Sequence, residues 1–282
     1  MQVIRFVESL RRLIQKAKAR NQRIGFVPTM GALHDGHCSL MRRCRQNNGL
    51  VVVSIFVNPK QFAPTEDFRK YPRREKTDRI LAQKAGVDIL FCPSGNEMYP
   101  DDHLTYIDVE KITKPLCGRS RPGHFRGVAT VVGKLLNMVM PDVLYLGQKD
   151  AQQALTIQRM IRDLNFPVQV KVCPIVRDAD GLALSSRNRY LTEKQRREAV
   201  ILYQSLREAK KRMIEGERRA GEITGMIRSR ITRNTSGRID YVECVDAETL
   251  ESSTMAGGKV MIALAVCFGQ TRLIDNMIVN LR

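Results

Sequence analysis

Short apolar runs alternate with amphipathic segments along residues 1–175 of the chain. Residues 50–57 (LVVVSIFV) form a β-branched run without polar alternation, which is typical of a central parallel strand covered on both faces. Because strand and helix patterns alternate, we expect an α/β fold built on a doubly wound parallel sheet. The predicted strands are 24–28, 50–57, 87–91, 143–147 and 168–176, and the predicted helices are 5–20, a helix from about Gly36, and helices near 74–85, 127–140 and 151–163.

The pattern changes after a turn-rich connection at residues 177–192. Thr192 and Gln195 have the spacing of a capping box, so we expect one long helix to begin there and to continue as far as Met213. Three apolar runs separated by turns follow this helix and predict a smaller α+β domain. We therefore divide the chain into residues 1–175 and 176–282, and place the last three strands at 239–245, 259–268 and 276–280.

The composition is that of an ordinary globular protein, with 43% hydrophobic and 27% charged residues. The seven cysteines form no CxxC pair and are odd in number, so we expect reduced thiols rather than a disulfide framework or a zinc knuckle. Charged residues interrupt the N-terminal segment, and no run of about 18 apolar residues occurs that could span a bilayer. We therefore expect a cytoplasmic protein without a membrane partner.

The formal net charge of +18 is unusual and would favour acidic partners such as nucleotides, small carboxylates or nucleic acid. Basic residues are densest at 207–238, which fits either the solvated face of a helical region or a nucleic-acid-binding stripe. The chain has no tryptophan and only 6% aromatic residues, so it is poor in the stacking side chains that single-strand binding proteins use. We therefore expect no nucleic-acid partner.

Two of the four histidines stand three positions apart in the loop after the first predicted strand, within FVPTMGALHDGHCSL. Gly31 and Gly36 could let backbone amides approach phosphate oxygens, and the following helix presents its N-terminal N–H groups to the same anion. His34 and His37 could each donate a hydrogen bond to a charged oxygen, while Asp35 could simply cap the helix. A structural turn and a zinc site are the alternatives, although no HExxH arrangement or downstream ligand pair supports zinc.

Three further polar loops follow predicted strands. The stretch FVNPKQF offers the amides of Asn58 and Gln61, which suit a polar or carboxylate substrate. The stretch GQKDAQQ would show Lys149 and Gln153 on one face of a helix that begins there, although Asp150 and Gln153 also have the spacing of a helix cap. The stretch LSSRN carries two hydroxyls and a guanidinium. Because ligands bind beyond the carboxyl ends of the strands in such sheets, we expect the four loops to face one crevice.

Taken together, these segments resemble the pantothenate synthetase family (pantoate–β-alanine ligases). The motifs that carry the resemblance occur in family order and cover essentially the whole chain. The HxGH signature alone is shared with class I aminoacyl-tRNA synthetases and nucleotidyltransferases, whereas the full set is highly specific. The motifs are PTMGALHDGHCSL, VSIFVNPKQF, YPRREKTD, RPGHFRGVATVVGKLLN, GQKDAQQ, DGLALSSRNRYL and RLIDN.

The resemblance implies an ATP-dependent condensation of pantoate with β-alanine through a pantoyl-adenylate, with release of AMP and pyrophosphate and with Mg²⁺ accompanying ATP. It also implies a Rossmann-like N-terminal domain, a C-terminal lid domain and a homodimer. Gln61 and Gln153 would bind pantoate, and His37 would be the family's proton donor. The positions that would contact ATP are Met30, Gly31, Ala32, Leu33, His34, Asp35, Gly36, His37, Gly147, Gln148, Lys149, Asp150, Val176, Leu184, Ser185, Ser186 and Arg187.

Two positions depart from the family pattern, because Gln148 stands where Glu is common and Cys117 stands where an acidic residue is common. The first departure leaves backbone contacts with ATP possible but not a carboxylate role. We assign no function to Cys117.

The first step of such a reaction joins a carboxylate to the α-phosphorus of ATP, although both reactants are anions. It needs alignment and neutralisation of developing charge more than proton transfer. We therefore expect His34, His37, Lys149 and Arg187 to act as fixed donors and charges at one site, without a metal bound by protein side chains. A nucleotidyltransferase of the same superfamily that acts on another small acceptor is the alternative.

Overall fold

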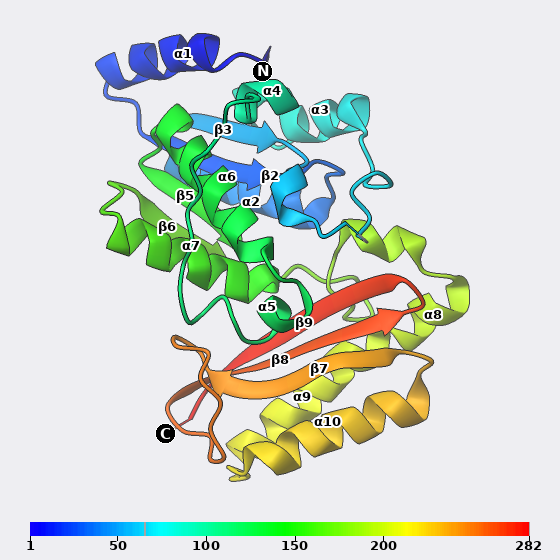
Figure 1. Cartoon of the computed structure of the whole chain (residues 1–282). Coiled ribbons are helices and arrows are strands. Elements are labelled where there is room, and N and C mark those ends of the chain that lie inside the picture. The colour runs from blue at the N-terminus through cyan, green and yellow to red at the C-terminus, as the bar shows by residue number, and fades with distance from the viewer. Residues whose placement is uncertain (65, 282) are drawn as a thin grey trace. The chain divides into compact units, whose positions relative to one another are not determined.

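A computed structural model gives the structure of the chain and describes residues 1–64 and 66–281 (Figure 1). The described chain forms two compact units. Two short segments that precede residue 175 in the sequence belong to the second unit, and the roles of the units as a substrate domain and a lid stay predictions. The first unit contains Met1–Thr113, Arg121–Gly147 and Gln153–Pro174, and the second contains residues 175–281 together with Lys114–Ser120 and Gln148–Gln152.

The first unit is built on a six-stranded parallel sheet in the order β1-β4-β3-β2-β5-β6. β2 lies between β3 and β5, so the winding reverses there and the loop after β2 starts at the switch point of the sheet. The predicted α/β fold is confirmed, and the edge strand β1 is an addition because three residues are too few to show a period. The strands are β1 Gln2–Ile4, β2 Ile24–Thr29, β3 Leu50–Ile55, β4 Ile89–Phe91, β5 Val143–Gly147 and β6 Gln169–Cys173.

Helices flank this sheet (Figure 1). α2 and α3 pack on one face, where Met41 and Ala82 join Val51 and Val53 in the core. Val51, Val52 and Val53 have no exposed surface, so consecutive residues of β3 are covered on both sides, as its unbroken apolar run predicts. The helices are α1 Val7–Ala19, α2 Asp35–Asn47, α3 Glu75–Lys84, α4 Gly95–Met98, α6 His124–Val139 and α7 Ala151–Asp163, with the 3₁₀ turn η1 Pro59–Gln61 after β3.

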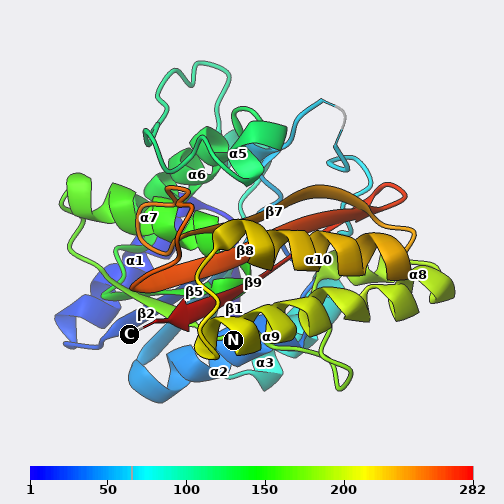
Figure 2. The ribbon, with the colours of Figure 1, turned by 90° about the horizontal axis from the view of Figure 1, so that it is seen from below.

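The second unit has a three-stranded antiparallel sheet in the order β7-β8-β9. α9 and α10 lie along one face of this sheet (Figure 2), and their buried apolar side chains form one core with it. The third strand starts at Thr271, five residues before the predicted position. The elements are α5 Cys117–Ser120, η2 Gln148–Asp150, η3 Ser186–Tyr190, α8 Glu193–Glu198, α9 Val200–Ile214, α10 Ala220–Asn234, β7 Arg238–Asp246, β8 Lys259–Phe268 and β9 Thr271–Asn280.

The prediction of one long helix from Thr192 was wrong. The capping box is present, because Thr192 Oγ1 accepts from Gln195 N at 3.2 Å and Gln195 Oε1 accepts from Thr192 N at 3.0 Å. It opens only the six-residue helix α8, and the helical run is interrupted at Ala199 before α9 starts. A capping box marks where a helix begins but carries no information on where it ends.

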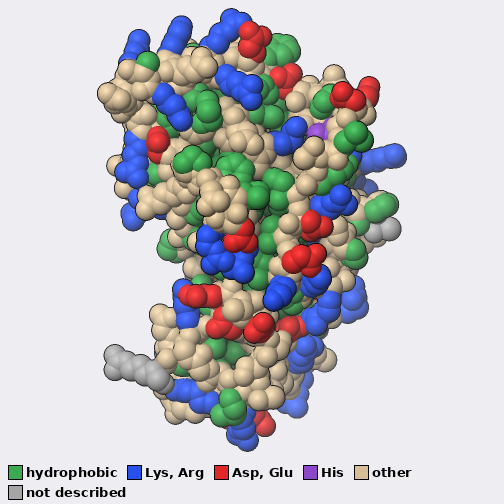
Figure 3. Space-filling view, turned by 60° about the vertical axis from the view of Figure 1, so that its left-hand side comes forward, with side chains coloured by type: hydrophobic (Ala, Val, Ile, Leu, Met, Phe, Trp, Pro, Cys, Tyr) green, Lys and Arg blue, Asp and Glu red, His purple; other side chains and the backbone are tan. Residues whose placement is uncertain are grey.

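The basic segment 207–238 forms the end of α9 and the separate helix α10. Ile223, Ile227 and Ile231 of α10 are fully buried at intervals of four residues, so the polar residues of this helix occupy its outward face. Figure 3 shows Lys and Arg side chains spread over the surface in view and mixed with Asp and Glu. The burial pattern of α10 is that of an amphipathic helix with one face in solvent.

Two predictions from composition can be compared with the described residues. All seven cysteines are free thiols and six of them are buried, as expected for reduced structural cysteines. Among the described helices, none combines the length and the apolar character that crossing a bilayer would require.

Candidate active site

The loop after β2 has a strained backbone that its small residues permit. Gly31 has φ of 81° and Ala32 has φ of 50°, both in the left-handed region. A Cβ atom at Gly31 would lie 2.9 Å from Ile55 Cγ2 and 3.0 Å from Asp78 Oδ2, so the space as well as the dihedral angle requires glycine. The chain therefore turns sharply at the switch point before it enters α2.

Asp78 of α3 holds this loop from beneath. The residue is 2% exposed, and its two carboxylate oxygens accept from the backbone amides of Ala32 at 2.9 Å and Leu33 at 2.8 Å. The amide of Gly31 donates to Thr29 Oγ1 at 3.1 Å. The sequence predicts that amides of this loop approach phosphate oxygens, but these three donate within the chain and fix the shape of the loop instead.

The two histidines form the N-terminal cap of α2. His34 is the N-cap residue, with its Nδ1 accepting from Gly36 N at 3.2 Å, and His37 Nδ1 accepts from His34 N at 3.4 Å. Their ring centroids lie 4.1 Å apart. The capping role given to Asp35 was therefore wrong, because Asp35 is already the first helical residue. A neutral imidazole whose Nδ1 accepts carries its proton on Nε2, so each ring would donate to an anion through Nε2.

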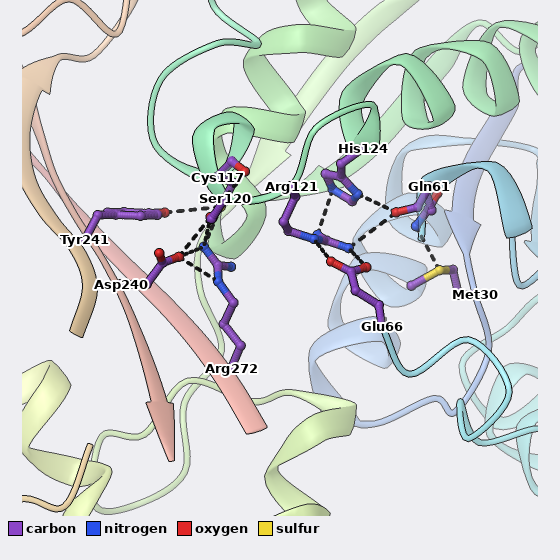
Figure 4. A network of polar contacts seen from close by, with 10 residues as sticks. All are labelled: Met30, Gln61, Glu66, Cys117, Ser120, Arg121, His124, Asp240, Tyr241 and Arg272. Carbon is purple, nitrogen blue, oxygen red and sulfur yellow. Dashed lines mark hydrogen bonds and ion pairs between the residues drawn. The ribbon is translucent and has the colours of Figure 1, made fainter. Parts of the chain in front are cut away.

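The loop after β3 contacts the histidine loop through Gln61. Its Nε2 lies 2.9 Å from Met30 Sδ (Figure 4), and Asn58 Nδ2 donates to its Oε1 at 3.1 Å. Asn58 is 1% exposed and also donates to Gly127 O at 3.0 Å, while its Oδ1 accepts from Lys60 N at 3.2 Å and from the Tyr99 hydroxyl at 3.0 Å. These four contacts use both donors and both lone pairs of the carboxamide. Asn58, expected as a substrate ligand, is thus engaged in holding Gln61.

His124, the first residue of α6, and Arg121, which precedes the helix, both contact the main chain of Gln61 (Figure 4). His124 Nδ1 donates to Gln61 O at 2.8 Å and Arg121 donates to the same oxygen at 3.4 Å. Arg121 also pairs through two nitrogens with the carboxylate of Glu66, at 2.6 and 2.7 Å. A Cβ atom at Gly127 would collide with the carbonyl group of Lys60, so only glycine lets α6 approach this turn so closely.

Glu66 stays charged in this arrangement. Burial opposes its charge, but the hydrogen bonds and the positive charge of Arg121 outweigh burial and lower the pKa of the Glu66 carboxyl below its ordinary value. Glu66, Arg121 and His124 are not among the site residues predicted from the sequence. The signal that could have found two of them is the motif RPGHFRGVATVVGKLLN, which contains Arg121 and His124.

Lys149 belongs to the second unit, where it lies in the 3₁₀ turn η2 rather than in a helix shared with Gln153. Its Nζ lies 3.3 Å from both carboxylate oxygens of Asp150. Gln148 donates through Nε2 to Asn276 Oδ1 at 3.3 Å, so this side chain has a structural contact even though it is not the Glu common in the family. α7 begins only at Ala151, because the turn intervenes.

The segment that contains the LSSRN stretch also belongs to the second unit. Leu184 N donates to Val176 O at 3.0 Å, which closes a narrow loop. Ser185 is the N-cap of η3, and its hydroxyl accepts from Arg187 N at 3.2 Å. The structure thus brings Val176, Leu184, Ser185 and Arg187 together as one compact turn.

The predicted site residues therefore form two groups. The first unit holds Asn58, Gln61, Gly147, Gln153 and the loop from Met30 to His37, and the second holds Val176, the Gln148–Asp150 turn and the Leu184–Arg187 turn. Within the first group, the loops after β2 and β3 contact each other, as expected for neighbouring parallel strands.

Known proteins that are similar to the chain show to which family it belongs. A model of the pantoate-beta-alanine ligase family matches residues 2–278. The chain belongs to the pantoate–β-alanine ligase family. It is 54% identical over 280 residues to the pantothenate synthetase of Acetivibrio thermocellus, covering 99% of this chain and 100% of the relative, and 52% identical over 280 residues to that of Moorella thermoacetica, covering 99% of each.

Solved pantoate–β-alanine ligases share the fold. The crystal structure of pantothenate synthetase from Thermus thermophilus superimposes with a TM-score of 0.93 at 43% identity, covering 98% of this chain and 99% of that one. The ligase from Francisella tularensis, complexed with beta-gamma ATP and β-alanine, gives 0.82 at 36% identity, covering 98% and 97%. The resemblance stated from sequence is thus confirmed, and this member of the family is a ligase that forms a C–N bond.

Proposed function

We propose that this ligase condenses pantoate with β-alanine through a pantoyl-adenylate, which is formed from ATP with release of pyrophosphate and consumed with release of AMP. The observation that carries the proposal is the family match from residue 2 to residue 278. The Francisella tularensis relative, complexed with beta-gamma ATP and β-alanine, supports the same two ligands for this chain.

In the first unit, Gln61 and Gln153 would bind pantoate, because a carboxamide can donate to its carboxylate and accept from its hydroxyls. Asn58 would act through Gln61 by keeping its side chain in one orientation. His34 and His37 would donate through Nε2 to phosphate oxygens, with His37 as the proton donor. The loop from Met30 to His37 would line the ATP site.

In the second unit, Lys149 and Arg187 would neutralise the charge that moves onto the α-phosphoryl group and the departing pyrophosphate. Ser185, Ser186 and the turn around Val176 would contact ATP beside them. A donor fixed in advance at developing charge is commonly worth about 2.7–4 kcal/mol of barrier. The two anionic reactants make such fixed positive groups the main requirement of the first step.

Magnesium would enter with ATP, bound to its phosphates, as part of the substrate. Across residues 1–64 and 66–281, no group of three or more His, Cys, Asp or Glu side chains that could hold a metal ion occurs. In this proposal the protein's own contribution to charge neutralisation comes from lysine, arginine and histidine.

In the second step the amine of β-alanine would attack the activated carbonyl carbon, AMP would leave with the electrons of the broken C–O bond, and the nitrogen would lose a proton to water. The adenylate is already activated, so no serine nucleophile is needed, and Ser185 Oγ is occupied as a helix cap.

We further infer that the second unit acts as a lid over the adenylate, and that the enzyme works as a cytoplasmic homodimer. Because the chain passes between the units five times, closure would bend several connections and not only the one near Val176.

The test is exchange of labelled pyrophosphate into ATP. Exchange that depends on pantoate, followed by AMP release and pantothenate formation when β-alanine is added, is the expected result. Exchange that occurs without pantoate but with a phosphorylated acceptor would favour a nucleotidyltransferase. Absence of any exchange, with pantothenate still formed, would overturn the adenylate.

A further inference from the structure

A buried side chain of β9 contacts the main chain on both sides of the Lys149 Cα. Asn276 donates through Nδ2 to the main-chain carbonyl oxygens of Gln148 at 2.9 Å and of Lys149 at 3.0 Å. Its Oδ1 accepts from Gln148 Nε2 at 3.3 Å, and the residue is 4% exposed. All of these atoms belong to the second unit. One carboxamide thus engages two consecutive peptide groups of the turn η2.

The chemistry of this contact is specific to a carboxamide. A primary amide offers two N–H donors and a carbonyl acceptor in one plane, which matches two adjacent carbonyl oxygens and one donor. A carboxylate of the same size would place its oxygens against the two carbonyl oxygens and provide no donor. A buried carbonyl that loses its partner costs about 1–3 kcal/mol.

Asn276 is itself held in place by its neighbour. Its main-chain N–H donates to Asp275 Oδ1 at 2.8 Å, and the Asp275 carboxylate also accepts from two nitrogens of Arg177 at 2.6 and 2.9 Å. Arg177 lies within the narrow loop that Val176 and Leu184 close, and it forms an antiparallel bridge with Ala183. The adjacent residues of β9 therefore hold both segments that supply proposed ATP contacts from the second unit.

From this geometry we propose that Asn276 is a positioning residue for Lys149. It fixes the peptide groups on both sides of the Lys149 Cα, so that the ammonium group is delivered to the phosphates in one orientation. The inference rests on the proposed function of Lys149, but the motif RLIDN, to which Asn276 belongs, had no role assigned from sequence. Asn276 would not touch the substrate and would act through the main chain of the turn.

The test variant is Asn276→Asp, which keeps the size of the side chain and removes both donors. Misplacing a reacting group by about 1 Å can lower a rate about 100-fold. We expect a loss of about that size in the turnover of pantoate-dependent pyrophosphate exchange, with the KM for pantoate changed less than about threefold. Asn280→Asp, on the same strand but exposed, is the matched control and should leave exchange unchanged.

A double-mutant cycle separates positioning from a general structural role. If Asn276 acts through Lys149, Asn276→Asp in the Lys149→Ala background should change turnover less than about threefold, because the group to be positioned is gone. If the loss remains about 100-fold in that background, the variant damages the enzyme by another route and the proposal is wrong. Unchanged turnover in the folded single variant would overturn it as well.

A second variant and a hydrogen-exchange experiment test the contacts of Asn276 where the first experiment gives no result. If Asn276→Asp does not fold, Asn276→Ala removes the donors without adding a charge and takes its place in the cycle. If wild-type protein shows no pyrophosphate exchange, the proposed function fails by itself. Hydrogen exchange of backbone amides then tests the Asn276 clamp, which consists of the hydrogen bonds of Asn276 with Gln148 and Lys149. Asn276→Ala should speed amide exchange at residues 148–152 and Asn280→Ala should not, whereas equal protection in both variants would exclude the clamp.

Discussion

The histidine loop before α2 and the turn η2 are held by opposite chemistry. The loop presents backbone N–H groups, and the buried carboxylate of Asp78 accepts two of them. The turn presents backbone carbonyls, and the buried carboxamide of Asn276 donates to two of them. In each case one side chain from a distant element satisfies two consecutive peptide groups, and its type follows from which backbone atoms the turn leaves unpaired.

Removal of these two clamps, Asp78 at the histidine loop and Asn276 at η2, should therefore have different effects. A carboxylate in the interior is stable only with the donors that compensate its desolvation, so loss of its charge or of its partners should mainly reduce folding stability. A neutral carboxamide carries a smaller desolvation penalty, because it has no charge to compensate. Its loss should disturb the orientation of Lys149 more than the stability of the second unit.

The largest effect on activity is expected when the ammonium group of Lys149 in η2 is removed. Lys149→Ala should lower the turnover of pyrophosphate exchange about 100- to 1,000-fold, with little change in the KM for ATP, because the ammonium group would act on charge that develops in the transition state. Steady-state exchange kinetics measure both constants, and Lys210→Ala on the exposed face of α9 is the control. A higher KM with unchanged turnover would mean that Lys149 only binds the ground state.

The Asp78→Asn variant tests how much the carboxylate of Asp78 stabilises the histidine loop. The substitution keeps the shape but turns one acceptor into a donor that faces a backbone N–H, so we expect the free energy of unfolding to fall by about 3 kcal/mol. Urea unfolding measures the change, and Glu75→Gln in the same helix, whose ion pair with Arg5 is exposed, should shift it by less than about 0.5 kcal/mol. If the two variants were equally stable, Asp78 would not be the support of the loop.

The secondary structure around both clamps could be predicted from sequence, but the clamps could not. The apolar runs at 24–28 and 50–57 predicted the strands, and parallel neighbours implied that the loops after them meet, as Met30 and Gln61 do. Asp78 lies 46 positions from Ala32 in the chain, so the contact depends on how α3 packs under the sheet. No local periodicity carries that information.

The same limit explains the errors at single residues. Asn58 was selected for its amide chemistry, yet sequence cannot show that a donor's capacity is consumed inside the protein. Asp35 and His34 are both able to cap a helix, and which of them does so depends on where the turn at Gly31 ends. The role of Asn276 depends on a partner 128 positions away at Gln148.

Gln61 is also held in place by close packing, because Gly127 of α6 lies against the main chain of the neighbouring residue Lys60. Gly127→Ala should cost about 2–3 kcal/mol of unfolding free energy, since the new methyl group meets main-chain atoms of Lys60 that cannot rotate away. Gly133→Ala in the same helix meets only the end of the Ile107 side chain and should cost less than about 1 kcal/mol, because alanine also favours the helix. Thermal unfolding of both variants measures the difference in stability. Equal losses of stability would show that the close contact between Gly127 and η1 has no special importance.

The smallest effect on stability is expected at the ion pair between Glu66 and Arg121. The pH dependence of this effect shows whether the charge of Glu66 or only its packing stabilises the fold. The pKa of Glu66 is lowered in the folded protein, so the pair stabilises the fold above the unfolded pKa near 4.3, and this contribution is lost as pH falls through the folded value. Glu66→Gln should therefore reduce the free energy of unfolding by about 1 kcal/mol at pH 7, and the gap from wild type should close as pH approaches 3. Glu8→Gln, in an exposed pair with Arg12, should show almost no gap at either pH. A Glu66→Gln gap that stays constant down to pH 3 would mean that packing around the side chain, rather than its charge, supports Arg121.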